Sequence, residues 1–110
     1  MITGVHAMFY SPKAQELREF FRDKLQVDHF DAGEGWLIFT PSEGEVGFHE
    51  SVETKQDISL YCSDIYATVE TLKARGVEFR GEVEDHGYGL VTSVVAPGDL
   101  LIQLYQPKYR

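Results

Sequence analysis

Residues that can bind a metal ion, move a proton or hold an organic ligand recur at alternate positions of four short segments. These segments are residues 2–10, 45–50, 57–64 and 100–106. Because successive side chains of a β-strand point to opposite faces, each segment would present these residues on one face. The residues on that face are His6, Met8, Tyr10, His49, Asp57, Ser59, Tyr61, Gln103 and Tyr105. The sequence therefore predicts a shared polar and aromatic face.

Gln103 raises a specific question, because it interrupts the apolar run from Leu100 to Tyr105. A buried amide without a partner costs about 1–3 kcal/mol. We expect Gln103 to face a cavity together with His6, Asp57 and Ser59, since alternation places all four on the same side of their strands.

His6 and Asp57 allow two interpretations. Asp57 can satisfy a structural histidine through a hydrogen bond. The same pair in a cavity is suited to general acid–base chemistry, with Asp57 fixing the tautomer of the imidazole.

The aromatic side chains and the segment 84–89 also leave alternatives open. Tyr10, Tyr61 and Tyr105 can stack on a planar ligand or serve as ordinary packing. The sequence "EDHGYG" predicts a hairpin turn, or a lid that places His86 or Tyr88 over the cavity.

Composition narrows the class of protein. The 110 residues suit one domain, and a formal net charge of −8 argues against binding to nucleic acid. That charge attracts a cationic ligand or only maintains solubility. No segment has the length or apolar content of a membrane span, and no signal peptide is visible, so we expect a cytoplasmic protein. The lone cysteine, Cys62, excludes an internal disulfide and is expected to be a small buried residue, whereas His29 is expected at an exposed strand end.

The order of predicted elements repeats. A strand at 2–10 precedes a helix that begins at Ser11-Pro12 and runs to Leu25, two short strands around Gly33 and Gly35, and a strand at 45–50. A strand at 57–64 then precedes a helix at 65–76, capped by Ser63 or Asp64, and strands at 77–83, 89–95 and 100–106. We therefore predict one α+β domain over 1–110, made of two β-α-β-β-β repeats at about 1–52 and 53–110.

This repeated pattern resembles the vicinal oxygen chelate superfamily, which includes glyoxalase I, extradiol dioxygenases and bleomycin resistance proteins. The resemblance rests on the paired units, with "GVHAMFY" opening the first and "LIQLYQPKY" closing the second. It implies that the two repeats form a curled mixed sheet, a cup with the helices outside and the polar face inside.

The resemblance also implies where a metal would bind. His6 matches the first ligand of the metal-using members. Gly47 stands on the fourth strand and cannot ligate, Asp57 replaces the usual histidine of the fifth, and Gln103 replaces the usual glutamate of the eighth. His49 can substitute for Gly47 only if the metal moves along the strand. Gln103 lacks the negative charge that makes a carboxylate a strong ligand, so this metal site is expected to be incomplete.

The resulting prediction is a metal-free protein that binds a small cationic or aromatic molecule, similar to the bleomycin-resistance branch. Its expected ligand-binding residues are the shared face described above together with Tyr88. The alternative is a glyoxalase-type lyase or dioxygenase that uses zinc, nickel, manganese or iron, held by His6 with Asp57, His49 or Gln103. A purely structural protein is a third class. We expect a homodimer of about 25 kDa, twice the chain mass of 12.5 kDa.

Overall fold

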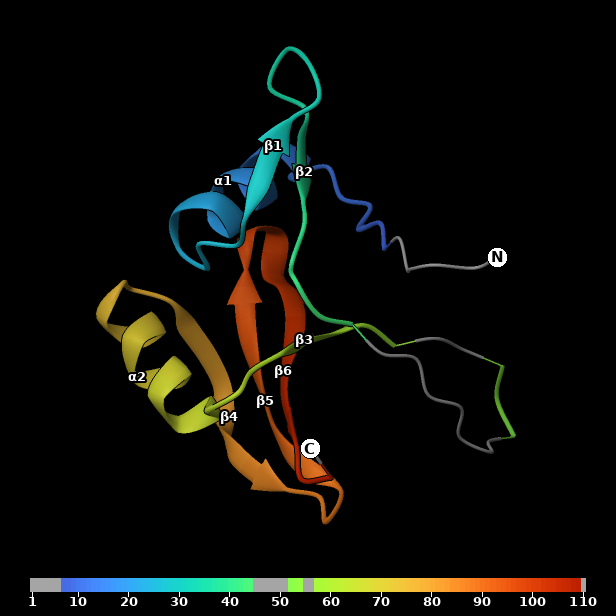
Figure 1. The fold of residues 1–110 in the computed structure, drawn as a ribbon, viewed down its shortest axis with the longest axis vertical. Coiled ribbons are helices and arrows are strands. Elements are labelled where there is room, and N and C mark those ends of the chain that lie inside the picture. The colour runs from blue at the N-terminus through green and yellow to red at the C-terminus, as the bar shows by residue number, and fades with distance from the viewer. Residues whose placement is uncertain (1–6, 45–51, 55–56, 110) are drawn as a thin grey trace.

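A four-stranded mixed sheet forms the centre of the protein (Figure 1). The computed structural model describes residues 7–44, 52–54 and 57–109. The strand order is β3-β6-β5-β4, where β3 is parallel to β6 and the other neighbours are antiparallel. The strands are β3 (Ser59–Tyr61), β4 (Glu78–Asp85), β5 (Gly89–Ala96) and β6 (Leu100–Pro107), and the short 3-10 helix η1 (Pro97–Asp99) joins the last two.

Helix α2 (Ile65–Ala74) connects β3 to β4, as the sequence predicts. The Asp64 carboxylate caps its first turn by accepting the Ala67 N–H at 3.1 Å. Gln106 on β6 ties the same end of the helix to the sheet, because its Oε1 accepts the Ile65 N–H at 2.7 Å. The helix ends at Ala74 with Arg75 as its C-cap, and Gly76 follows with a φ of +82°, which suits a residue without a Cβ atom.

The first repeat contributes helix α1 (Ala14–Asp23) and a two-stranded sheet of β1 (His29–Asp31) and β2 (Leu37–Phe39). The turn between these strands follows the predicted glycines. Both oxygens of the Asp31 carboxylate accept hydrogen bonds there, from the N–H groups of Gly33 at 2.7 Å and Gly35 at 3.2 Å.

The start of α1 and the segment before it differ from prediction. Ser11 is not the N-cap: its Oγ accepts the Lys13 N–H at 3.0 Å, and this local turn delays the helix until Ala14. Residues 7–10 lie outside the strands of the described part of the chain, although they were predicted as part of the opening strand. The strand expected at 45–50 and residues 2–6 of the opening strand lie outside the described residues.

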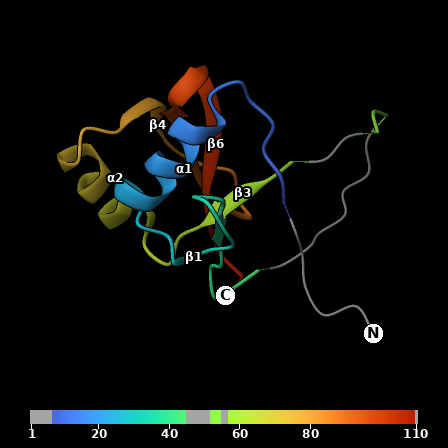
Figure 2. The ribbon, with the colours of Figure 1, turned by 90° about the horizontal axis from the view of Figure 1, so that it is seen from above.

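Both helices lie on the same side of the four-stranded sheet (Figure 2). The core between the helices and the sheet is formed by apolar side chains of all three. These are Leu17 and Phe21 of α1, Ile65, Val69 and Leu72 of α2, and Val94, Ala96, Ile102 and Leu104 of the sheet. Burial of these side chains removes apolar surface from water, which is the main stabilising contribution to such a fold. Neither described helix is long and apolar enough to cross a membrane.

An irregularity in β4 curls the sheet. The pairing of β4 with β5 shifts between Arg80 and Glu84, and Gly81 takes a φ of +77° at this bulge. A bulge of this kind bends its strand and increases the local twist. The predicted α+β fold with a curled mixed sheet is therefore confirmed.

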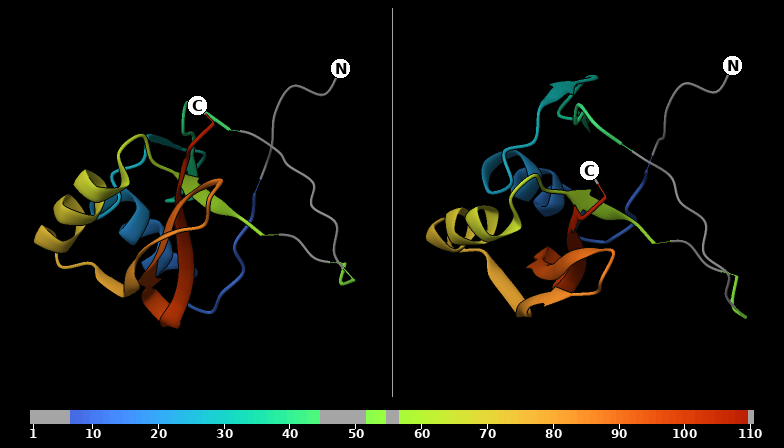
Figure 3. Two further views of the ribbon diagram at one scale, coloured as in Figure 1. Left: turned by 90° about the horizontal axis from the view of Figure 1, so that it is seen from below. Right: turned by 60° about the horizontal axis from the view of Figure 1, so that its bottom comes forward.

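The C-terminal ends of the two helices hold each other by reciprocal hydrogen bonds. Lys24 Nζ donates to the Arg75 carbonyl oxygen at 2.7 Å, and Arg75 Nη1 donates to the Lys24 carbonyl oxygen at 2.8 Å. Each residue is the C-cap of its helix, and the two are 51 positions apart. Ala14 and Ile65, the first residues of the helices, have the same spacing, so Lys24 and Arg75 occupy equivalent positions in the two helices. Figure 3 shows α1, in blue, beside α2, in yellow-green.

This reciprocal contact generates a stability prediction. Lys24→Met and Arg75→Met are each expected to lower the free energy of unfolding by about 0.5–1.5 kcal/mol, because each removes a charged donor from a helix C-terminal carbonyl. Chemical denaturation measures the loss.

The matched control is Arg22→Met, which removes a cation from the same helix but breaks only an exposed pair with the adjacent Asp23. We expect this variant to have the same free energy of unfolding as wild type within experimental error, because an exposed ion pair contributes little stability. Equal losses for all three variants would contradict the assigned role of the reciprocal bonds.

Candidate functional site

The sheet face opposite the helices, here called the open face, carries a line of polar side chains across all four strands. Ser59 pairs with Gln103, Gln103 with Ser93, and Ser93 with Arg80. Directly paired residues point to the same face of a sheet, so these four side chains form one row, here called the polar row. With strands about 4.8 Å apart, the row spans about 14 Å.

Gln103 lies on the open face because its neighbours on β6 are fixed in the core. Ile102 and Leu104 are only 1% and 2% exposed, and both pack toward the helices. Alternation then turns Gln103 to the other side, where its Nε2 donates to Ser59 Oγ at 2.9 Å. This hydrogen bond explains how the apolar strand accommodates an amide.

An aromatic row runs beside the polar row. Tyr61 pairs with Tyr105, and Tyr105 with Val91, so these side chains also lie on the open face. The Tyr105 ring contacts that of Tyr88 at a centroid distance of 6.0 Å, and its hydroxyl donates to the hydroxyl of Tyr109 at 3.1 Å. The aromatic row therefore continues into the hairpin that joins β4 to β5.

That hairpin is a tight turn held by its own side chains. The His86 N–H donates to the Gly89 carbonyl oxygen at 2.9 Å, and Gly87 has a φ of +83°, which favours glycine. His86 Nε2 lies 2.9 Å from Glu84 Oε1, and its Nδ1 lies 3.5 Å from the Tyr88 hydroxyl. The hairpin thus places an imidazole and a phenol at the end of the aromatic row.

An ion pair ties the hairpin to the C-terminal segment that follows β6. Lys108 Nζ donates to Asp85 Oδ2, and this contact, followed by the Gly87 N–H, holds the pKa of the Asp85 carboxyl below its usual range. The pair is solvent-exposed and adds little stability by itself. Its position nevertheless fixes the hairpin beside Tyr105.

The structure assembles only part of the predicted site. Ser59, Tyr61, Gln103 and Tyr105 share the open face, and Tyr88 adjoins it. Asp57 is exposed, two residues before Ser59. Met8 and Tyr10, before α1, are 43% and 90% exposed. His6, Gly47 and His49 lie outside the described residues.

Two members of the polar row, Ser93 and Arg80, were not among the predicted site residues, because both lie outside the four segments that carry the resemblance. The alternation within "GLVTSVV" was a usable signal, because Val94 is fully buried and its neighbour Ser93 must therefore face the other side.

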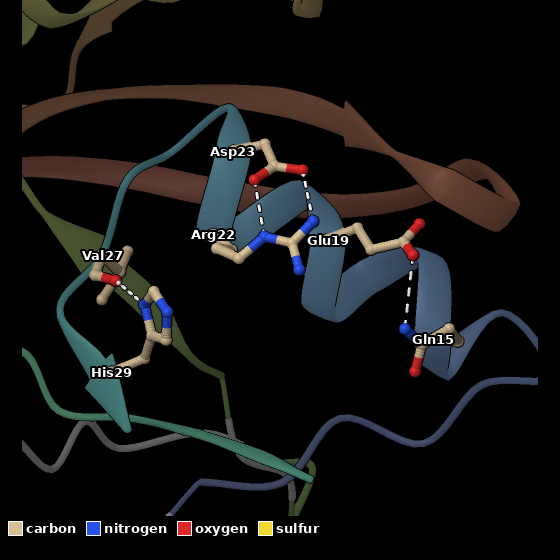
Figure 4. A network of polar contacts seen from close by, with 6 residues as sticks. All are labelled: Gln15, Glu19, Arg22, Asp23, Val27 and His29. Atoms are coloured by element: carbon tan, nitrogen blue, oxygen red, sulfur yellow. Dashed lines mark hydrogen bonds and ion pairs between the residues drawn. The ribbon is translucent and has the colours of Figure 1, made fainter. Parts of the chain in front are cut away.

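Other reactive or polar groups lie away from the open face. Cys62 is buried toward the helices, and burial raises the pKa of its thiol, so it behaves as a small core residue. Figure 4 shows the polar contacts along α1, where Arg22 binds Asp23 through two hydrogen bonds of 2.6 and 2.7 Å. His29 is exposed as predicted, and its Nδ1 lies 3.0 Å from the Val27 carbonyl oxygen.

A groove of about 300 Å³ lies beside α2 and is lined by residues of that helix, by the residues that flank it and by Leu25, which follows α1. Its polar lining includes Ser63, Thr68, Thr71 and Arg75. Both charged groups that line this groove already have partners, since Arg75 donates to the Lys24 carbonyl oxygen and Asp64 accepts the Ala67 N–H.

Within the described residues, no group of three histidine, cysteine, aspartate or glutamate side chains is arranged to hold a metal ion. The open face instead presents amide, hydroxyl, phenol and guanidinium groups. Such groups recognise the polar edge and the ring faces of an organic molecule.

The chain matches the model of one protein family and is similar in fold to solved structures. The family model of the Glyoxalase/Bleomycin resistance protein/Dioxygenase superfamily matches residues 5–104. Among solved structures, the chain is similar to TnmS3, an antibiotic binding protein from Streptomyces sp. CB03234, with a TM-score of 0.67 and 18% identity over 98% of this chain and 100% of that one.

A second similar structure is VPC_CASS1, from the mobile metagenome of V. Pseudocholerae. Its TM-score is 0.53 at 14% identity, over 96% of this chain and 98% of that one. At these identities the two structures establish likeness of fold. No curated protein matches the sequence significantly.

Gly89 is expected to control the position of the Tyr105 ring. A Cβ atom at Gly89 would overlap the Tyr105 ring and lie 2.8 Å from the Gln106 carbonyl oxygen. Gly89→Ala should therefore lower the free energy of unfolding by about 1–3 kcal/mol and shift the ring signals of Tyr105 in an NMR spectrum.

Gly44→Ala is the control, because a Cβ atom there meets nothing within 4 Å. If Gly89→Ala were as stable as Gly44→Ala and left the Tyr105 signals unchanged, the close contact between Gly89 and Tyr105 would be wrong.

Proposed function

Because this chain belongs to the Glyoxalase/Bleomycin resistance protein/Dioxygenase superfamily, we propose that it binds a small planar organic molecule on the open face without a metal ion. The observation that carries this proposal is the hydrogen bond of 2.9 Å between Gln103 Nε2 and Ser59 Oγ, in a row bordered by Tyr61 and Tyr105. An amide both donates and accepts hydrogen bonds, so it can bind a ligand group that contains both a donor and an acceptor.

The aromatic row and the polar row would contact different parts of the ligand. The tyrosine rings offer flat apolar surfaces with a polar end, on which an aromatic ligand can stack. The polar row supplies hydrogen-bonding groups that fix the orientation of such a ligand. The likeness to TnmS3, which is described as an antibiotic binding protein, supports an antibiotic-like organic molecule as the ligand.

The described residues do not fit a metal centre of the kind that the superfamily implies. Gln103, at the position of the usual glutamate, is neutral, and its amide nitrogen is turned toward Ser59 as a donor. Asp57 is exposed, and one carboxylate with one neutral amide is a poor ligand set for a transition metal. We therefore propose binding without metal chemistry. Tight metal binding in a titration would instead support the alternative, a glyoxalase-type enzyme.

We further propose that the protein acts as a homodimer. The polar and aromatic rows lie on the sheet face opposite the helices, as the strand pairing and the buried core residues require. Phe30 and Trp36 in the first repeat are also about half exposed, at 54% and 51%. A second copy would bury such surface and enclose the ligand, and two-fold pairing is the commonest closed arrangement.

The substitution Gln103→Glu tests the metal-free proposal, because it restores the usual carboxylate at nearly constant size. Isothermal titration calorimetry should show no stoichiometric zinc or nickel binding to wild type and measurable binding to the variant. The variant should also bind a neutral probe, 2-naphthamide, about two- to tenfold more weakly, because a carboxylate cannot donate a hydrogen bond to it.

Leu101→Glu is the matched control, since it adds the same charge two residues earlier on β6 and outside the polar row. It should gain no metal affinity. Tight binding of zinc or nickel to wild type, with no gain in Gln103→Glu, would identify Gln103 as a working ligand and refute the proposal.

A further inference from the structure

Arg80 differs from the other basic residues of the protein. Within residues 7–44, 52–54 and 57–109, each other lysine or arginine contacts an anion, a carbonyl oxygen or an aromatic ring, and Arg80 contacts none of these. The contrast is sharp because Arg80 lies on β4, a strand that also contains Glu78, Glu82 and Glu84. An unpaired guanidinium on an acidic strand is available to a ligand.

The fold places Arg80 at one end of the polar row. The adjacent Phe79 packs against the core, so alternation turns Arg80 to the open face, opposite Ser93. The bulge begins at the next residue, Gly81, and bends the strand there. Bulges frequently re-aim a neighbouring side chain at a binding site.

The polar row contains no carboxylate. From β3 to β4 its members are two hydroxyls, one amide and one guanidinium, so its only formal charge is the positive charge of Arg80. The nearest carboxylates on the same face belong to other rows: Glu84 is paired with Val91, and Glu78 with Val95. A ligand aligned along the polar row therefore meets neutral groups first and a cation at its end.

We propose that Arg80 selects the ligand of the open face, and that this ligand is a flat aromatic carboxylate whose carboxylate binds Arg80 while its ring lies on Tyr105. This inference rests on the proposed function and adds the chemical class of the ligand. A guanidinium holds a carboxylate through two parallel N–H···O hydrogen bonds, which fixes orientation as well as charge.

The negative charge of the whole chain does not oppose this selection at contact distance. A formal charge of −8 favours cations at long range, but salt screens that field over about 8 Å at physiological ionic strength. Direct hydrogen bonds between Arg80 and a carboxylate act within that distance. An aromatic carboxylate therefore has the opposite charge to the cationic ligand that net charge alone predicts, and binding measurements can distinguish the two.

Three naphthalene probes that share a ring system separate these alternatives: 2-naphthoate, 2-naphthamide and 2-naphthylmethylammonium. Isothermal titration calorimetry should show that wild type binds 2-naphthoate about tenfold more tightly than the ammonium probe. Arg80→Gln should weaken 2-naphthoate about ten- to a hundredfold, while 2-naphthamide changes by no more than about threefold. Arg80→Lys should recover only part of the loss, because it keeps the charge without the planar fork.

Arg18→Gln is the matched control, since it removes the same charge from α1, where Arg18 lies 4.4 Å from the Trp36 ring. It should bind all three probes like wild type. Tighter binding of the ammonium probe, or an unchanged affinity of Arg80→Gln for 2-naphthoate, would overturn the selection by Arg80 and leave the proposed function standing. Failure of all three probes to bind wild type would overturn both.

Discussion

The strict alternation of side chains along β6 is the constraint on which the rest of the structure depends. Ile102 and Leu104 must be buried against α1 and α2, because the core between the helices and the sheet is built around them. Gln103 and Tyr105 are then forced onto the opposite face, whatever their polarity. Since β6 lies between β3 and β5, its register also aligns Ser59 and Ser93 with Gln103. One apolar requirement thus organises both the core and the candidate site.

Much of this arrangement was predictable because it follows from local rules. The two helices were predicted from the residues that begin and end them, and their first residues, Ala14 and Ile65, are 51 positions apart. Residue type predicted Ser63 or Asp64 as the N-cap of α2, and the structure has Asp64 there. Residue type also predicted the end of the helix near Gly76, which follows the C-cap and has a positive φ. The partner of Gln103 was also predicted in part, because Ser59 was expected on its face.

The features that could not be predicted depend on competition or on distant pairing. Ser11 has the residue type of an N-cap, but its hydroxyl accepts the Lys13 N–H in a local turn, and the helix begins only at Ala14. Residues 7–10 alternate as a strand does, yet a strand also needs a partner that the local sequence cannot specify. Arg80 reaches the polar row only through the register of β4 with β5. The reciprocal bonds of Lys24 and Arg75 likewise appear only when the two helices meet.

The central claim is that ligands bind to the open face and not to the groove beside α2. The most direct test is an NMR titration of the isotope-labelled protein with 2-naphthoate, following the side-chain amide of Gln103 and the ring signals of Tyr105. Binding on the open face should produce saturable shifts at Gln103, Tyr105 and the backbone of Ser93, with none at Thr71. Shifts confined to the groove around Thr71 and Arg75, with Gln103 and Tyr105 unchanged, would contradict it.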